Sequence, residues 1–146
     1  NKKILIRSPK AIRPWQHVME PLSGYLLLGA KLFQKKLNYK LYPSWNFGPN
    51  LKNCKTVKYL VNYFKKHWGD KKIIITFHKK KNFYESKLLK LNIQKAKKEL
   101  GWKPTLDINT SLKLPIDWYK AFFEKKDMEV ITKKQIRLFF KKIDQK

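Results

Sequence analysis

Apolar side chains recur at helical spacing in several parts of the chain, and this periodicity predicts five helices. The predicted helices cover residues 17–35, 57–68, 93–100, 108–124 and 132–142. Thr56 and Asp107 are residue types that cap helix N-termini, and Gly69 and Gly101 are suited to end helices. Pro115 lies inside the predicted helix 108–124. Because an interior proline costs about 3 kcal/mol, we expect a kink or a break there.

Short apolar runs rich in β-branched or aromatic residues predict strands at residues 3–6, 45–47 and 72–77. A proline-containing loop, 8–16, is expected to join the first strand to the first helix, and residues 48–50 read as a turn. The mixture of helices and short strands indicates the α/β class. With neither an internal repeat nor a low-complexity linker, the 146 residues are expected to form one unit.

Composition narrows the class of protein further. A hydrophobic content of 42% with five Trp indicates a globular chain, and its apolar runs are too short to cross a bilayer. Cys54 is the single cysteine, so no intrachain disulfide can form, which suits the reducing cytoplasm. The three His are far apart and lack Cys or carboxylate companions at ligand spacing, so no metal site is predicted.

The formal net charge of +25 raises the question of nucleic-acid binding. Only three of the 35 basic residues are Arg, namely Arg7, Arg13 and Arg137, and the Lys are scattered along the whole chain. Functional polyanion sites usually carry Arg, whose planar fork grips phosphate in two places. A solvated lysine surface is therefore the favoured interpretation. A small basic nucleic-acid-binding protein stays open as the alternative.

Four segments carry more specific information. Residues 13–25 read Arg-Pro-Trp-Gln-His-Val-Met-Glu-Pro-Leu-Ser-Gly-Tyr, and residues 45–50 read Trp-Asn-Phe-Gly-Pro-Asn. Residues 84–92 read Tyr-Glu-Ser-Lys-Leu-Leu-Lys-Leu-Asn, and residues 95–104 read Lys-Ala-Lys-Lys-Glu-Leu-Gly-Trp-Lys-Pro. Together they resemble the nucleotide-sugar dehydratases of the NAD-dependent epimerase/dehydratase family, which are extended short-chain dehydrogenases/reductases. The resemblance covers nearly the whole chain and is nearest to the branch that acts on CDP-glucose.

The resemblance implies a set of substrate-binding residues. Arg13 would contact the diphosphate or the nucleotide, Trp15 would wall the nucleotide pocket, and Gln16 completes the same motif. Glu85 would accept hydrogen bonds from ribose hydroxyls, although Tyr84 and Asn92 depart from the family pattern around it. The alternatives are a surface Arg paired with a carboxylate, a core Trp and a solvated Glu. His17 is expected to be structural.

Packing roles are expected for other residues of the four segments. Trp45 and Phe47 are predicted to pack, and Gly48 is expected to permit either a positive φ or a close approach of the backbone. Leu100 and Trp102 are predicted to belong to the core.

The motifs for cofactor binding and catalysis do not occur in these 146 residues. The five glycines do not form Gly-x-x-Gly-x-x-Gly, and no Tyr is followed four positions later by Lys. The resemblance therefore implies that residues 1–146 are the C-terminal substrate-binding lobe of a Rossmann-type enzyme whose core is largely absent here. The NAD-binding domain and every catalytic residue would lie upstream. This chain is expected to hold no catalytic or cofactor-binding residue.

For the whole enzyme, the resemblance implies a lyase that converts CDP-glucose to CDP-4-keto-6-deoxyglucose with bound NAD, for the deoxysugars of surface polysaccharide such as lipopolysaccharide O-antigen. Homodimers are common in the family, with their dimer helices largely upstream. A non-functional product of a split gene is a further alternative. We expect the chain alone to be inactive and to be poorly soluble or molten, with Leu26, Leu28, Leu32 and Phe47 among the candidates for exposure.

Overall fold

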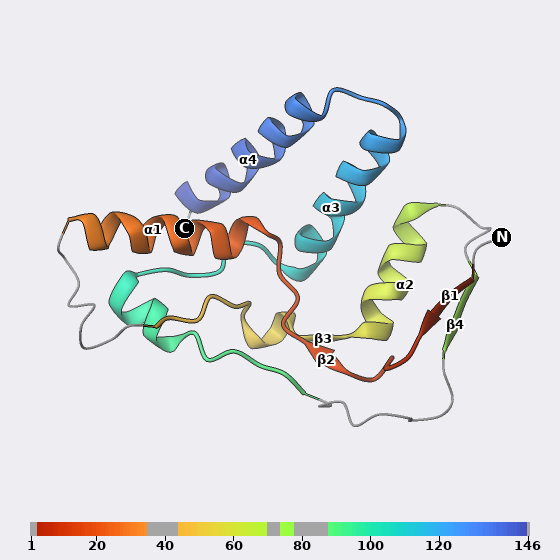
Figure 1. Ribbon diagram of the computed structural model, residues 1–146, viewed down its shortest axis with the longest axis horizontal. Helices are drawn as coiled ribbons and strands as arrows, with labels where there is room; N and C mark the ends of the chain where they lie inside the picture. Colours follow the sequence, from red (N-terminus) through yellow and green to blue (C-terminus); the bar gives the residue numbers. More distant parts are fainter. Residues whose placement is uncertain (1–2, 35–43, 70–73, 78–87, 146) are drawn as a thin grey trace.

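A computed structural model describes residues 3–34, 44–69, 74–77 and 88–145 (Figure 1). The helices of these ranges are α1 (Met19–Phe33), α2 (Val57–Trp68), α3 (Ile108–Phe123) and α4 (Met128–Asp144), with a 3-10 turn, η1 (Leu51–Asn53), and a π-helical turn, η2 (Ala96–Leu100). The strands are β1 (Lys3–Ile6), β2 (Ile12–Arg13), β3 (Lys55–Thr56) and β4 (Ile74–Phe77). The mixture of helices and short strands confirms the α/β class.

The strands form two separate pairs. β1 runs parallel to β4, from Lys3 opposite Ile74 to Ile6 opposite Phe77, which confirms the first predicted strand and the described part of the last. β2 runs antiparallel to β3. The prediction that residues 8–16 form only a loop is wrong, because β2 lies within them. Its partner strand comes from a distant part of the sequence, so the local pattern gave no sign of it.

The strand predicted at residues 45–47 is also wrong. Residues 44–50 have no regular secondary structure. The carbonyl oxygen of Phe47 accepts a hydrogen bond from the Gln16 side chain at 3.0 Å, and the Phe47 ring packs against Gly24 of α1. Side-chain contacts of an irregular segment therefore replace the strand pairing that the apolar, aromatic run suggested.

The predicted helix ends are largely confirmed. Thr56 Oγ1 accepts from the Tyr59 amide at 3.1 Å and Asp107 Oδ1 accepts from the Thr110 amide at 3.0 Å, so both residues cap helices. Gly69 and Gly101 have φ values of 90° and 71°, the left-handed conformation that ends a helix. The helix predicted at 132–142 begins earlier, at Met128, because the side chain of Asp127 caps it.

The helix that contains Pro115 is continuous, so the predicted break does not occur. Leu114 and Ile116, on either side of the proline, are both buried. Gln135 of α4 donates a hydrogen bond to the carbonyl oxygen of Leu114 at 2.8 Å. Packing against α4 therefore supports α3 at the position where local propensity disfavours it.

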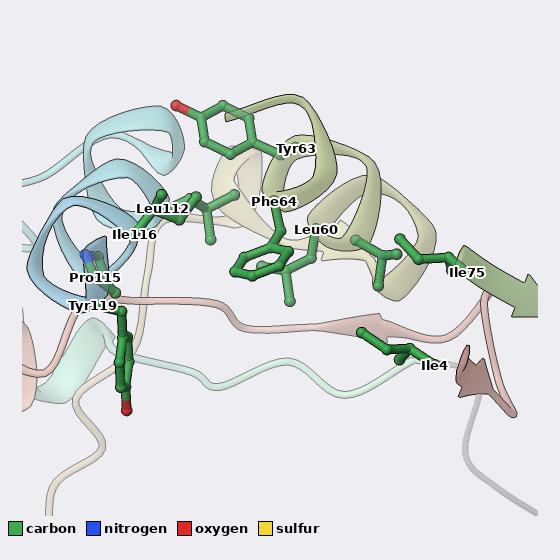
Figure 2. Close-up of a pocket in the computed structure, with 10 residues that line it drawn as sticks. Ile4, Leu60, Tyr63, Phe64, Ile75, Leu112, Pro115, Ile116 and Tyr119 are labelled. Atoms are coloured by element: carbon green, nitrogen blue, oxygen red, sulfur yellow. The ribbon is translucent and has the colours of Figure 1, made fainter. Parts of the chain in front are cut away.

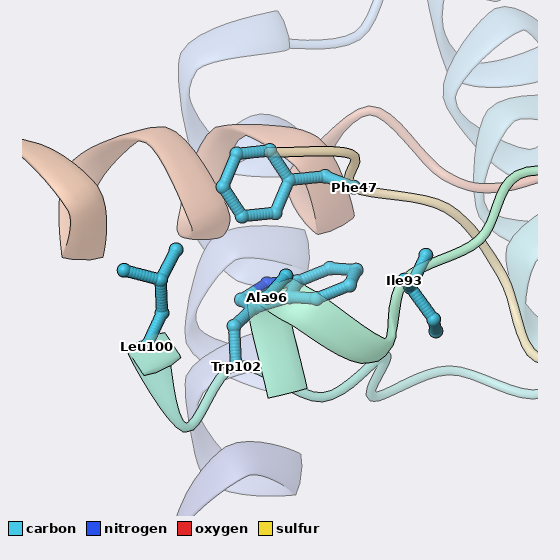
Figure 3. Close-up of a cluster of buried hydrophobic side chains, with 5 residues drawn as sticks. All are labelled: Phe47, Ile93, Ala96, Leu100 and Trp102. Carbon is cyan, nitrogen blue, oxygen red and sulfur yellow. The ribbon is translucent and has the colours of Figure 1, made fainter. Parts of the chain in front are cut away.

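Two clusters of buried side chains form the core of the described residues. Figure 3 shows the first, in which α1, the 44–50 segment and η2 meet; it contains Phe47, Ile93, Ala96, Leu100 and Trp102. The rings of Phe47 and Trp102 meet edge to face at 5.1 Å. The second cluster joins Leu106, Leu114 and Phe139, with Met19 packed against it.

These clusters confirm that Leu100 and Trp102 are core residues. The expected exposure of Phe47 is wrong, since the chain buries it within its own core. Leu26 is 70% exposed as expected, whereas Leu28 and Leu32 are half-buried.

Candidate functional site

The loop before α1 is fixed by the β2–β3 pair. Ile12 lies opposite Thr56 and Arg13 lies opposite Lys55. Arg13 is half-buried, and its Nη1 donates to the carbonyl oxygen of Ile12 at 2.9 Å. Arg13 therefore lies in a strand pair, and the second strand of that pair, β3, continues directly into α2. Pairing with β3 fixes the backbone of Arg13 more firmly than a free surface loop would.

Trp15 and Gln16 connect this loop to distant segments. Trp15 Nε1 donates to the carbonyl oxygen of Lys55 at 2.9 Å, across 40 residues of sequence. Gln16 Nε2 donates to the carbonyl oxygen of Phe47 at 3.0 Å, across 31 residues. Gln16 Oε1 is buried and has no hydrogen-bond partner in the part of the chain that the structure describes. The Arg13–Gln16 loop and the 45–50 segment thus meet in space.

His17 has a structural role, as expected. It is buried, and its Nδ1 accepts a hydrogen bond from the Met19 amide at 3.3 Å, at the start of α1. Burial lowers the pKa of His17 below its usual value, which keeps the imidazole neutral. A neutral ring that accepts at Nδ1 carries its proton on Nε2.

Glu20 is an important residue that the sequence interpretation missed. Its carboxylate is 1% exposed and accepts hydrogen bonds from the Thr105 amide, 2.9 Å from each oxygen, and from the Leu106 amide at 2.6 Å. The bonds fasten the first turn of α1 to the segment before α3. The sequence did carry a sign of this role, because Glu20 is a carboxylate among largely apolar residues of the predicted helix.

Two further predicted positions have different outcomes. Glu85 lies outside the described residues; Leu88, three positions later, pairs with Ile12 of β2. Of the two possibilities predicted for Gly48, the structure shows a close approach of its backbone, here to a side chain, because an added Cβ would lie 2.9 Å from Leu91 Cβ. The φ of Gly48 is not positive.

A separate apolar groove of about 300 Å³ lies between β1, β4, α2 and α3 (Figure 2). Its lining is almost entirely apolar, with Ile4 and Ile75 from the strands facing Phe64 of α2 and Pro115 of α3. A charged nucleotide would lose hydration there without gaining partners, so the groove does not suit one.

The described ranges contain no group of three or more His, Cys, Asp or Glu that could hold a metal ion. Within the same ranges, no helix combines the length and the apolar character that crossing a bilayer requires.

Comparison with known proteins shows what the chain is similar to. No family model matches the chain. It is similar to the CDP-glucose 4,6-dehydratase of Salmonella typhimurium, with 36% identity over 136 residues, or 93% of this chain. The resemblance expected from the motifs is therefore confirmed. The chain spans 37% of the length of that relative.

Proposed function

We propose that this chain is the C-terminal, substrate-binding portion of a CDP-glucose 4,6-dehydratase. The whole enzyme would convert CDP-glucose to CDP-4-keto-6-deoxyglucose with the net loss of one water. The main support is the Gln16–Phe47 hydrogen bond, since it joins two of the four segments that carry the resemblance. The bond brings residues of both motifs to one place, as a site that draws on both motifs requires.

In this proposal Arg13 binds the diphosphate. A guanidinium presents two parallel N–H groups that match two phosphate oxygens, and its half-buried position reduces screening by solvent. Trp15 forms a wall beside it, with the indole N–H bound to Lys55. Gln16 uses Nε2 for Phe47, so we give it the role of holding the loop in place. Glu85 remains our candidate for the ribose hydroxyls.

NAD would be bound by residues outside this sequence. The glycines of the chain lack the dinucleotide-binding spacing, so its residues do not fit the cofactor. When bound in the whole enzyme, NAD would accept and return the hydride. We propose that the chain supplies only substrate contacts and is inactive by itself, and that the enzyme works in the cytoplasm.

The β1–β4 pair supports the need for a further domain. Parallel sheets normally have both faces covered, and a sheet of two strands is marginal by itself. Yet Leu5 is 57% exposed, Ile4 is 42% exposed and Ile74 is 38% exposed. The apolar groove lies directly beside these residues. We propose that additional strands and their covering helices, from an NAD-binding domain, complete this sheet.

The test is a binding experiment with matched variants. CDP-glucose, CDP, UDP and a single-stranded RNA are titrated into the chain at two salt concentrations. Arg13→Lys keeps the charge but loses the fork, so it should weaken CDP-glucose binding by about 1–3 kcal/mol. Arg7→Lys is the control, since Arg7 is exposed and lies outside the site.

Two results would contradict the proposal. Equal loss in both variants, or no loss in Arg13→Lys, would make Arg13 structural. RNA binding that collapses with salt, without any preference for CDP, would favour the basic nucleic-acid-binding alternative. Separately, incubation of the chain with CDP-glucose and NAD should give none of the alkaline absorbance of a 4-keto sugar. Clear turnover would disprove the claim that the chain is inactive alone.

A further inference from the structure

A continuous set of aromatic rings joins the C-terminal ends of α2 and α3, which pack beside each other (Figure 1). The Trp68 ring of α2 stacks on Phe64 with 5.0 Å between ring centroids, and it meets the Phe123 ring of α3 edge to face at 5.9 Å. Phe123 meets Phe122 at 5.7 Å, and Phe122 stacks on Trp118 at 5.8 Å. These five rings form one aromatic patch that spans two helices.

The outer side of the aromatic patch is open to solvent. Phe123 is 67% exposed, Phe122 is 51% exposed, and Tyr119, in edge-to-face contact with Trp118, is 53% exposed. Exposed apolar side chains that occur singly need no explanation, whereas adjoining ones mark a surface that binds something. The α2–α3 end is therefore a candidate interaction surface.

Lysines surround the aromatic patch at the ends of the two helices. They are Lys65, Lys66, Lys120, Lys125 and Lys126. Lys120 lines a shallow depression together with Trp68, Phe123 and Glu124. The Glu124 carboxylate forms an ion pair with Lys126 at 2.6 Å, and Asp127 is engaged as the cap of α4. The nearby acidic groups therefore have partners of their own, and the surroundings of the patch are positive.

The shape and the charge of this surface suit a flat, anionic partner. The depression is too shallow to enclose a peptide side chain, whereas a bilayer needs no enclosing walls. Aromatic rings beside lysines are typical of segments that bind a membrane interface, where the rings enter the headgroup boundary and the ammonium groups meet anionic lipids. A second copy of the chain suits the surface less, because the same lysines would face one another.

Single-stranded nucleic acid suits the surface less as well. It binds through bases that stack on the faces of aromatic rings. Here Trp68 already uses one ring face for Phe64, and Phe122 uses one for Trp118, with interplanar angles of 23° and 5°. Insertion into a lipid interface does not require a free ring face.

We propose that the ends of α2 and α3 bind the surface of an anionic lipid bilayer. Phe122 and Phe123 enter the interface, and the surrounding lysines, Lys120 among them, meet the lipid phosphates. The site lies outside the loop that holds Arg13, so this inference does not depend on the proposed function.

The experiment measures the binding of the full chain to vesicles by sedimentation. One set of vesicles is phosphatidylcholine alone, and the other also contains phosphatidylglycerol. Phe122→Ser/Phe123→Ser removes two rings of the patch. Its matched control is Phe33→Ser/Phe140→Ser, which removes two rings that are 90% and 48% exposed on α1 and α4. Thermal unfolding by circular dichroism checks that each variant is folded.

A second pair of variants tests the lysines. Lys65→Gln/Lys120→Gln removes two charges beside the patch, whereas Lys98→Gln/Lys103→Gln removes two charges in and just after η2. Because both variants lower the net charge equally, a difference between them reports position and not total charge.

We expect the chain to bind the vesicles that contain phosphatidylglycerol and not those of phosphatidylcholine alone. Phe122→Ser/Phe123→Ser and Lys65→Gln/Lys120→Gln should each weaken this binding about tenfold, and each control should stay within about threefold of the original chain. Equal weakening by the patch variants and their controls would overturn the inference, because binding would then follow general charge and exposure. A chain that binds neither kind of vesicle would overturn it as well.

Two further measurements test the other partners. A single-stranded oligouridylate is titrated into the same variants, and sedimentation velocity gives their oligomeric state. Loss of RNA binding in Phe122→Ser/Phe123→Ser, with vesicle binding unchanged, would make the patch a nucleic-acid surface. A dimer of the original chain that becomes a monomer in this variant would show that a second copy covers the rings. Either result would overturn the lipid assignment.

Discussion

Two glycines of α1 allow a matched test of the first core cluster. An added Cβ at Gly24 would lie 2.3 Å from Phe47 Cδ1 and 2.6 Å from Cε1, whereas an added Cβ at Gly29 would have no atom within 4 Å. Ordinary carbon contacts lie at about 3.5–4.0 Å, so Gly24→Ala forces the ring or the helix to move by more than about 1 Å.

The Phe47 ring has little room to move. Trp102 meets it edge to face at 5.1 Å, Tyr25 meets it at 5.3 Å, and Gln16 holds its carbonyl oxygen. Overpacking of this kind costs about 1–3 kcal/mol, and the size of the clash places Gly24→Ala near the upper end. The gain in helix propensity returns about 1 kcal/mol, which leaves a net loss of about 2 kcal/mol. Gly29→Ala should gain about 1 kcal/mol.

Thermal unfolding measures the difference directly. At about 2–4 °C per kcal/mol for a chain of this size, Gly24→Ala should unfold about 4–8 °C below the original chain and Gly29→Ala about 2–4 °C above it. Phe47→Leu should relieve the clash. The double variant Gly24→Ala/Phe47→Leu should therefore lose less stability than the sum of the losses in the two single variants. A Gly24→Ala chain as stable as the original would refute the packing of Phe47 on α1.

Three further predictions concern other features. Glu20→Gln should lower the free energy of unfolding by about 1–3 kcal/mol in urea denaturation, because an amide cannot accept from Thr105 and Leu106 as the carboxylate does. Glu99→Gln is the control, since its amide oxygen can still accept from Trp45. A loss of stability in Glu20→Gln no larger than in Glu99→Gln would contradict the prediction. His17 has a pKa below its usual 6.5 because it is buried, so the unfolded chain binds more protons and stability should fall as the pH drops below about 6.5. In His17→Asn the slope between pH 7 and 5.5 should flatten, and an unchanged slope would show that other groups cause it. The chain alone should bind a dye specific for apolar surface, at the exposed apolar residues of α1 and β1. A monomer that unfolds cooperatively and binds no dye would contradict this, because the chain would then be a self-sufficient domain.

Features set by neighbouring residues could be predicted from the sequence. Thr56 and Asp107 cap their helices because each side chain reaches an amide three residues ahead. Gly101 ends η2 because the left-handed conformation requires only a positive φ at the glycine itself. The strand at 45–47 was predicted wrongly and β2 was missed, since strand formation depends on a partner elsewhere in the chain. Pro115 shows the same limit, because packing against α4 outweighs its local propensity.

The candidate site was predictable in part. The motif located Arg13, Trp15 and Gln16, and the structure brings their loop to the 45–50 segment. Glu20 was missed because acidic residues are favoured at the N-terminal turn of a helix even when they are exposed. Its presence there could be explained without assuming that it is buried.

The β1–β4 pair has a consequence for the order of folding. It joins residues 3–6 to residues 74–77, so its formation must close a long loop for the sake of a few hydrogen bonds. The hairpin of α3 and α4 has contacts that are local in sequence, such as the Trp118 indole to Thr132 Oγ1 at 2.9 Å. Local contacts form faster, so the C-terminal hairpin should be native-like while β1 is still unpaired. During that interval the apolar strand edges are open to other chains, and a second domain that pairs with them would end the interval.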